Sequence, residues 1–314
     1  MIKNFSARSL GITGRQSELL ELALTYAFEG LEIDMRDLYQ RSQRTNVEDA
    51  TKYLSSAKMA YNQKNSPLAW TGFMLDVDMD ADEDTFTAQV GSLHPIAELA
   101  ETIGVRRAYA LIPAATDRLP FNEYFEAQRG RIQQLTEVLS AKKIRLGLGL
   151  QAGKDLAADK QFEFVRNVDG FLSLVSDAGP DVGFILNTWD WKVGGGTPQQ
   201  LDKLTADNLM AVVISSVPED VNPADAGTAD RILPTHDSSF DHVSLISQLS
   251  SMGYKGPVSP GAAAARYKGQ TRESIVKEAQ ESIDGIFQAA GLEVAALPMD
   301  LIEDIPYETS TSIT

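Results

Sequence analysis

The sequence predicts an α/β fold, a closed barrel of eight parallel strands in which each strand is followed by a helix. Short apolar runs alternate about eight times with longer stretches of helical period. Eight such units in roughly 250–300 residues fit a (β/α)₈ barrel. The alternative is an open doubly wound sheet, which usually carries a glycine fingerprint after its first strand. The corresponding segment, GITGRQSELL, lacks the GxGxxG pattern.

In the first half of the chain, each expected strand leads through a polar loop into an expected helix. The first helix is predicted from RQSELLELALTYAF, where leucines and alanines form one helical stripe. The second helix is expected to begin after Asn46, a good helix cap. The expected strands span residues 9–13, 30–35, 70–78 and 105–113, and the expected helices span residues 15–28, 46–63, 82–104 and 121–143.

The second half repeats this scheme without repeating the sequence. Its expected strands span residues 144–150, 182–188, 209–216 and 256–260, and its expected helices span residues 156–179, 197–206, 240–253 and 271–291. No linker divides the chain, so residues 1–291 are expected to form a single barrel. Residues 292–314 are polar, acidic and rich in Thr and Ser, and we expect a loose or surface-wrapping extension there.

Composition excludes several classes of function. The 314 residues carry a formal net charge of −16, which would repel nucleic acid. There is no cysteine, so disulfides, thiolate zinc sites and a cysteine nucleophile are excluded. No apolar run has the length of a membrane span, and the N-terminus does not have the pattern of a signal peptide. We therefore expect a cytoplasmic protein, and a homodimer stays open.

Chemistry in such a barrel belongs at the carboxyl ends of the strands. Glu32 and Asp34 lie on one side of their strand by period-two alternation, either as a site or with one carboxylate in a structural role. Asp190 is flanked by Trp189 and Trp191, and aromatic walls suit the apolar faces of sugars, although tryptophan is also an ordinary core residue. The expected ligand-binding residues are Glu32, Gln151, Asn187, Trp189, Trp191 and Ser216.

The chain has 3 histidines. His236 stands beside Asp237 in the loop after the seventh expected strand, which should overhang the barrel mouth. A His–Asp pair there could perform acid–base catalysis, or could simply be solvated. His94 and His242 are expected to be structural or surface residues. The candidate catalytic residues are therefore Asp190, His236 and Asp237.

Three segments resemble one known family. They are FNEYFEAQRGRIQQLTEVLSAKKIRLGLGL, VGFILNTWDWKVGGGTPQQLDKLTADNL and LSSMGYKGPVSP. They resemble the sugar phosphate isomerase/epimerase group, the xylose-isomerase-like TIM barrels, and the resemblance covers most of residues 6–291. It implies one divalent metal at the mouth, held by a glutamate, an aspartate, a histidine and a glutamate from the fifth to eighth strands. Paired glutamates would then shuttle a proton through an enediolate.

The resemblance also implies that this chain lacks those ligands. The four ligand positions fall at Gly149, Asn187, Val213 and Gly261, and a further family histidine becomes Asp190. An endonuclease-type site with several zinc ions would need more histidines than the chain has. We expect no cofactor, and a divalent metal such as manganese or zinc only if its ligands have moved. An uncharged mouth would instead favour a neutral polar ligand.

Three hypotheses follow. The first is a barrel that binds a sugar, a polyol or a similar small molecule, with a degraded metal site and weak or no catalysis. The second is an active isomerase, epimerase or lyase with a relocated or metal-independent acid–base site at Asp190 or the His236–Asp237 pair. The third is a non-catalytic scaffold that binds a partner through the barrel surface or the acidic tail.

Overall fold

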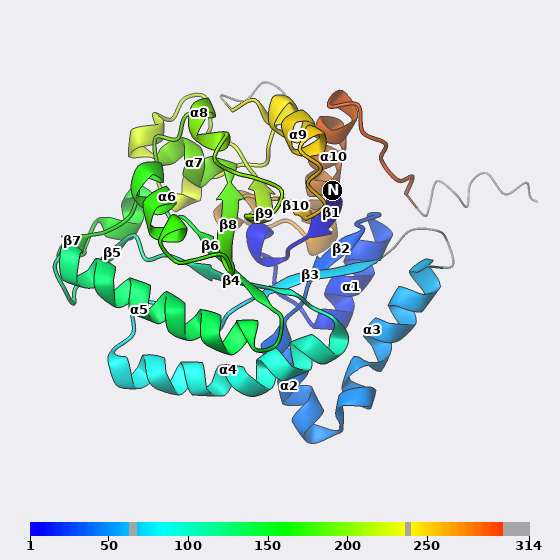
Figure 1. The fold of residues 1–314 in the computed structure, drawn as a ribbon. Coiled ribbons are helices and arrows are strands. Elements are labelled where there is room, and N and C mark those ends of the chain that lie inside the picture. The colour runs from blue at the N-terminus through cyan, green and yellow to red at the C-terminus, as the bar shows by residue number, and fades with distance from the viewer. Residues whose placement is uncertain (63–67, 236–239, 298–314) are drawn as a thin grey trace, which may run out of the picture.

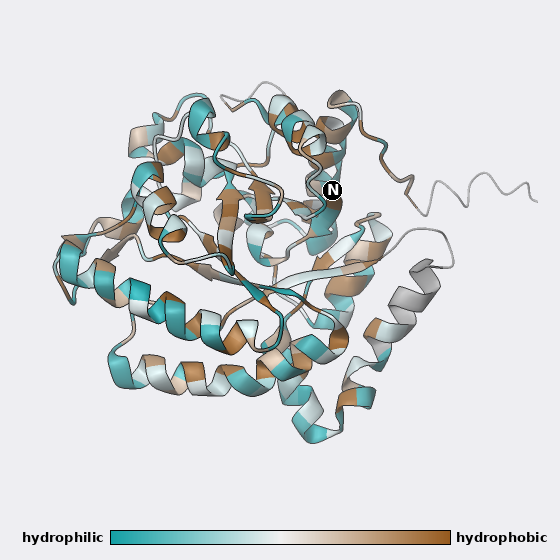
Figure 2. Cartoon of the chain, in the orientation of Figure 1, coloured by the Kyte–Doolittle hydropathy of each residue, from teal (hydrophilic) through white to brown (hydrophobic). Residues whose placement is uncertain are grey.

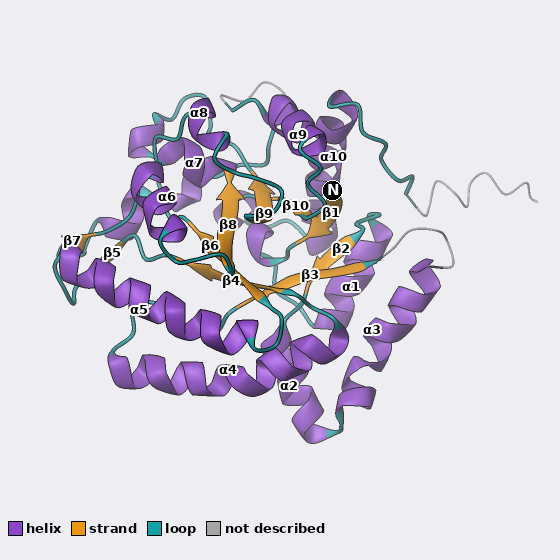
Figure 3. Ribbon diagram, in the orientation of Figure 1, coloured by secondary structure: helices purple, strands orange, loops and turns teal. Residues whose placement is uncertain are grey.

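The computed structural model describes residues 1–62, 68–235 and 240–297. Eight parallel strands close into a barrel, surrounded by helices, which confirms the predicted (β/α)₈ architecture (Figures 1 and 3). The order around the barrel is β1-β10-β9-β8-β6-β4-β3-β2. The barrel strands are β1 (Ile2–Phe5), β2 (Gly30–Glu32), β3 (Ala69–Met74), β4 (Arg107–Leu111), β6 (Arg145–Gly149), β8 (Val182–Asn187), β9 (Leu209–Ile214) and β10 (Pro257–Pro260).

Helices form the outer layer, and the longer ones pack apolar residues inward while polar residues cover much of their outer face (Figure 2). Side-chain caps define most helix starts, and the predicted Asn46 cap is confirmed, because its Oδ1 accepts the Asp49 N–H at 2.8 Å. The helices are α1 (Gln16–Thr25), α2 (Met35–Arg44), α3 (Val47–Asn62), α4 (Glu83–Ile103), α5 (Phe121–Ser140), α6 (Val168–Ser176), α7 (Thr188–Val193), α8 (Pro198–Leu201), α9 (His242–Ser251) and α10 (Arg272–Ala289). No helix in the described part of the chain is long and apolar enough to cross a membrane.

Glycines make room for one large side chain inside the barrel. Tyr109 on β4 is buried, and its hydroxyl donates to the Thr71 carbonyl at 2.9 Å. A Cβ on Gly72 would lie 2.4 Å from the Tyr109 hydroxyl, and one on Gly147 would lie 3.1 Å from its ring. Any larger residue at these positions would displace Tyr109 and with it the packing of the barrel interior.

Three sequence-based expectations are wrong. Residues 9–13 are not the first strand: a short 3₁₀ helix covers Arg8–Leu10, and the strand is β1 at Ile2–Phe5. The helix α2 was not predicted. The helix expected over 156–179 is only α6, because Phe162–Glu163 (β7) instead pairs antiparallel with Ala115–Thr116 (β5). Of the expected extension, residues 292–297 contain no helix or strand, and residues 298–314 lie outside the described residues.

The strand β1 was hidden because its polar residues are satisfied by distant partners. Lys3 points out of the barrel, and its Nζ lies 2.8 Å from Asp284 Oδ1 on α10. Gln280 Nε2 donates to the other Asp284 oxygen at 2.5 Å. Asn4 donates through Nδ2 to Ser259 Oγ at 2.8 Å and accepts from Thr71 Oγ1 at 2.7 Å. Buried charges and amides paired in this way can occupy a strand that local hydrophobicity does not reveal.

The Lys3–Asp284 pair joins the first strand to the last helix, and its side chains are only 3% and 10% exposed. Replacing Asp284 with Asn leaves the Lys3 ammonium buried without its counter-charge. We expect the free energy of unfolding, measured by urea denaturation, to fall by about 3–5 kcal/mol. The matched change Glu281→Gln breaks the exposed Lys277–Glu281 pair on the same helix and should cost less than about 1 kcal/mol. Equal losses for the two variants would contradict this role of the buried pair.

Candidate functional site

The four positions matched to the family's metal ligands lie together at one side of the barrel mouth. They stand at the ends of β6, β8 and β9 and directly after β10, which are consecutive in the barrel. A Cβ on Gly149 would lie 2.7 Å from Leu111 Cδ2, and a Cβ on Gly261 would lie 2.7 Å from Val213 Cγ1. Apolar side chains thus line this corner. No three His, Cys, Asp or Glu side chains in the described ranges converge as a metal site would require, so these residues do not fit the family's metal.

Asn187 ends β8 and already has partners inside the protein. Its Oδ1 accepts from the Trp189 N–H at 3.1 Å and from the Ser215 hydroxyl at 3.0 Å. These bonds fix the side chain as the cap of α7 and leave the Nδ2 group as its remaining donor. Asn187 can therefore offer a hydrogen bond to a ligand at the mouth, but its oxygen is engaged.

Asp190 lies in the first turn of α7 and is buried, 7% exposed. Its Oδ1 accepts the Ala152 N–H at 2.9 Å, which ties α7 to the loop after β6. Burial raises the pKa of Asp190 to about 6, against the opposing effects of the Ala152 bond and the Arg231 charge. A carboxyl group with this pKa can gain and lose a proton near neutral pH.

Arg231 is held beside Asp190 by the long loop after β9. Ile232 pairs with Ser216 through bonds of 2.9 and 3.0 Å, and the Arg231 carbonyl accepts from the Ala263 N–H at 2.9 Å. The guanidinium lies 5.9 Å from the Trp189 ring centre. Among the described residues its side chain has no hydrogen-bond partner and no carboxylate within 4.0 Å, and Nε is buried. The side chain as a whole is half-buried, and the Asp190 charge and the Trp189 ring partly compensate its charge. The buried Nε is therefore a donor that a ligand oxygen could complete.

Two other side-chain atoms near Arg231 are buried and lack a partner within the described part of the chain. They are Trp189 Nε1 and Ser216 Oγ. Native proteins leave few buried polar groups unpaired, and each such group asks for a physical reason. Together with Arg231 and Asp190, they form a set that we call the Arg231 cluster: Asp190, Trp189, Ser216 and Arg231.

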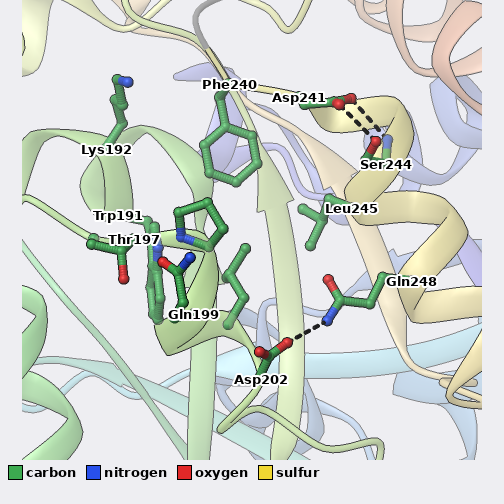
Figure 4. A pocket seen from close by; sticks show the side chains of 13 residues that line it. Trp191, Lys192, Thr197, Gln199, Asp202, Phe240, Asp241, Ser244, Leu245 and Gln248 are labelled. Carbon is green, nitrogen blue, oxygen red and sulfur yellow. Dashed lines mark hydrogen bonds between the residues drawn. The ribbon is translucent and has the colours of Figure 1, made fainter.

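Other predicted residues lie elsewhere. Trp191 lines a groove of about 480 Å³ between α8 and α9, with Phe240 and Leu245 (Figure 4). Gln151 follows β6 and is half-buried. Asp34 is a helix cap, because its Oδ1 accepts the Asp37 N–H of α2 at 2.9 Å. His236 and Asp237 lie outside the described residues.

Two of the three histidines are placed in the structure. His242 is buried, and its Nε2 lies 3.1 Å from Thr188 Oγ1 and 3.2 Å from the Ser215 carbonyl. Burial lowers its pKa to about 4, so the ring is neutral and joins α9 to the ends of β8 and β9. His94 lies beside a surface groove between α4 and α5.

Sequence reasoning missed two side chains at the mouth. Arg231 lies within the long polar loop after β9, and nothing in its neighbourhood along the chain indicates that it is half-buried beside the barrel. Gln16 reads as an ordinary first residue of a helix, yet it is 2% exposed and lines a cavity of about 520 Å³ over the ends of β1, β2 and β3. Glu32, which was predicted, lines the same cavity, and its Oε1 lies 3.4 Å from Arg8 Nε.

A family model described as the xylose isomerase-like TIM barrel matches residues 20–286. The chain belongs to the xylose isomerase-like TIM barrel family. This confirms the resemblance inferred from the sequence. No curated protein matches the chain.

Solved structures of this family share the fold at low sequence identity. A xylose isomerase domain protein from Alicyclobacillus acidocaldarius has a TM-score of 0.76 at 20% identity, covering 93% of this chain and 99% of that one. The IolI protein with a bound zinc atom has a TM-score of 0.71 at 16% identity, covering 91% and 98%. D-Psicose 3-epimerase from Clostridium cellulolyticum H10, solved with D-tagatose, has a TM-score of 0.64 at 11% identity, covering 92% and 99%.

The raised pKa of Asp190 predicts a pH-dependent stability. The folded protein binds the Asp190 proton more tightly than the unfolded chain, whose pKa is 3.8, so this contribution is complete below pH 3.8 and is lost as pH rises through about 6. The Asp190→Asn variant has no ionisable group at this position, so it does not lose stability there as the pH rises. We expect the variant to be more stable than wild type at pH 7, by up to about 3 kcal/mol, and equally stable below pH 4.

Denaturant unfolding at several pH values measures this difference. His242 has the opposite sign in an overlapping window, because its pKa falls from 6.5 to about 4 and its contribution is lost as pH falls. Both proteins contain His242, so its contribution cancels when the free energy of unfolding of the wild type is subtracted from that of Asp190→Asn. A difference that stays constant from pH 4 to 7 would contradict the assignment.

Proposed function

We propose that this barrel binds a sugar or a related polyhydroxylated small molecule at its mouth, without the metal arrangement of its family, and that it is weakly active or inactive as an isomerase. The proposal rests on the guanidinium of Arg231, which lies near Asp190 and whose buried Nε has no hydrogen-bond partner among the described residues. A bound hydroxyl or carbonyl oxygen would accept from this group and complete its contacts.

The chemistry of the Arg231 cluster supports a hydroxylated ligand. Arg231 Nε and Trp189 Nε1 are donors, the Ser216 hydroxyl both donates and accepts, and the open Asp190 oxygen accepts. A sugar presents several hydroxyl groups that each donate and accept within a small volume. The D-psicose 3-epimerase structure, which contains D-tagatose, supports the same class of ligand.

The residues at the family's metal positions support a metal-free site. Glycine at 149 and 261 and valine at 213 supply no ligand atom from a side chain, and the Asn187 oxygen already accepts two hydrogen bonds. The ligand's hydroxyl groups would therefore be held by hydrogen bonds from the protein rather than through a cation.

Arg231→Met tests this role directly. Because methionine keeps the apolar stem but removes a half-buried charge that lies near Asp190, we expect the ligand-free protein to stay folded, with a melting temperature within a few degrees of the wild type. The same change should abolish the thermal shift that a bound sugar produces in the wild type. A screen of monosaccharides and polyols by thermal shift measures both effects.

Arg145→Met is the matched control. Arg145 sits at the opposite end of the barrel, and its guanidinium donates to the Asp207 carbonyl at 2.6 Å and the Pro180 carbonyl at 3.1 Å. This variant should lose stability and keep sugar binding. If Arg231→Met binds sugars like the wild type, the proposed site is wrong.

A second candidate function is proton transfer by Asp190. Its pKa of about 6 suits a general base near neutral pH, and the neighbouring Arg231 could stabilise an oxyanion that forms on a carbonyl substrate. This would be an isomerase, epimerase or lyase reaction without a metal. Turnover of a bound ketose that Asp190→Asn abolishes while binding persists would favour this candidate over a binding protein.

A further inference from the structure

A second polar cavity lies across the mouth from the Arg231 cluster. It has a volume of about 520 Å³ and opens over the ends of β1, β2 and β3. In the barrel order, β2 stands opposite β8 and β3 stands opposite β9. Asp190 and Trp189 follow β8, while Ser216 and Arg231 follow β9. The residues of the Arg231 cluster and those of the cavity therefore follow strands on opposite sides of the same mouth.

Gln16 gives this cavity an open hydrogen-bond donor. The side chain is 2% exposed, and its Oε1 accepts the Asp34 N–H at 2.6 Å. That bond fixes the orientation of the amide, so Nε2 must point to the other side. Nε2 is buried, has no partner in residues 1–62, 68–235 and 240–297, and belongs to a residue that lines the cavity. A buried amide donor without an acceptor is unfavourable unless a ligand oxygen accepts from it.

The charged groups of this cavity are already matched in pairs. Arg8 pairs with Glu32 at 3.4 Å, Arg36 pairs with Asp76, and Asp34 caps α2. Two arginines face three carboxylates, so a free anion would gain no net attraction here. Hydroxyl groups fit better, because each can accept from Gln16 or an arginine and donate to a carboxylate oxygen.

Backbone bonds connect the two sides of the mouth. Ser9, next to Arg8, accepts through its carbonyl from the Ala262 N–H at 2.9 Å, and the Arg231 carbonyl accepts from Ala263 at 2.9 Å. The loops that carry Arg8 and Arg231 thus flank the same two residues after β10. The pKa of Arg231 is lowered mainly by burial, and the charge of Arg8 lowers it further. Both arginines border one opening.

We propose that the cavity over β1–β3 is a second sugar subsite, with Gln16 as its amide donor, and that the ligand of the mouth is a two-ring sugar such as a disaccharide or glycoside. This inference rests on the proposed function. One ring lies at the Arg231 cluster, and the second ring is held by Gln16, Glu32 and the outer arginine Arg36. Gln16 and Arg36 then determine the length of ligand that the mouth selects.

Calorimetric titration with disaccharides and their component monosaccharides tests the inference. The panel includes maltose, lactose, sucrose and trehalose beside glucose, galactose and fructose. The wild type should bind at least one disaccharide ten or more times tighter than either component. Gln16→Glu keeps the oxygen that accepts from Asp34 and replaces the donor with an acceptor. It should remove this advantage and leave monosaccharide affinity unchanged.

Arg36→Ala is a second variant, whose side chain is 61% exposed and whose loss should not prevent folding. It should weaken disaccharide binding about three- to tenfold. Arg129→Ala removes an exposed arginine, paired with Glu126 on α5, and should change nothing. If monosaccharides bind as tightly as disaccharides, or if Gln16→Glu keeps the disaccharide advantage, the second subsite is refuted and the proposed function stands. If no sugar binds the wild type, both the second subsite and the proposed function are refuted.

Discussion

Closure of the barrel is the constraint on which the site depends. The short strand β1 must pair with β10 on one side and β2 on the other, and a buried ion pair between Lys3 and Asp284 fastens it to the last helix. We call the contacts of β1 with β10, β2 and α10 the seam. Only when the seam is closed do the ends of β2 and β3 lie across the mouth from those of β8 and β9. Each buried polar group in the seam requires its own partner. This requirement favours one register for the pairing of β1 with its neighbouring strands.

The mouth uses its polar groups differently from the seam. Lys3 and Asn4 have partners inside the protein, whereas Arg231, Trp189, Ser216 and Gln16 each have a buried donor that no other described residue satisfies. Such groups reduce the stability of the ligand-free protein, and they are tolerated where they prepare a surface for a ligand. Their position at the carboxyl ends of the strands is the usual place of active and binding sites in this fold. In the proposed function, the polar groups at β1 stabilise the fold and those at the mouth bind the ligand.

Much of the fold could be predicted from the sequence because apolar runs and helical stripes are local signals. Seven of the eight expected strands overlap barrel strands. The strand β1 was not predicted, because its polar residues Lys3 and Asn4 are satisfied by partners far along the chain. Part of the site was also predictable. Asp190 was found through its tryptophan neighbours and the family resemblance. Arg231 and Gln16 were not, because an unsatisfied donor is a property of the folded surroundings and leaves no mark in the sequence.

Gly149, Val213 and Gly261 offer no side-chain ligand at the positions matched to the family's metal. We propose that the mouth holds a hydroxylated ligand through hydrogen bonds alone. The most direct measurement combines elemental analysis of the purified protein, grown with added manganese and zinc, with sugar titration before and after treatment with a chelator. We predict less than one metal ion per chain and a sugar affinity that the chelator leaves unchanged. One manganese or zinc ion per chain, together with loss of sugar binding on chelation, would contradict the claim.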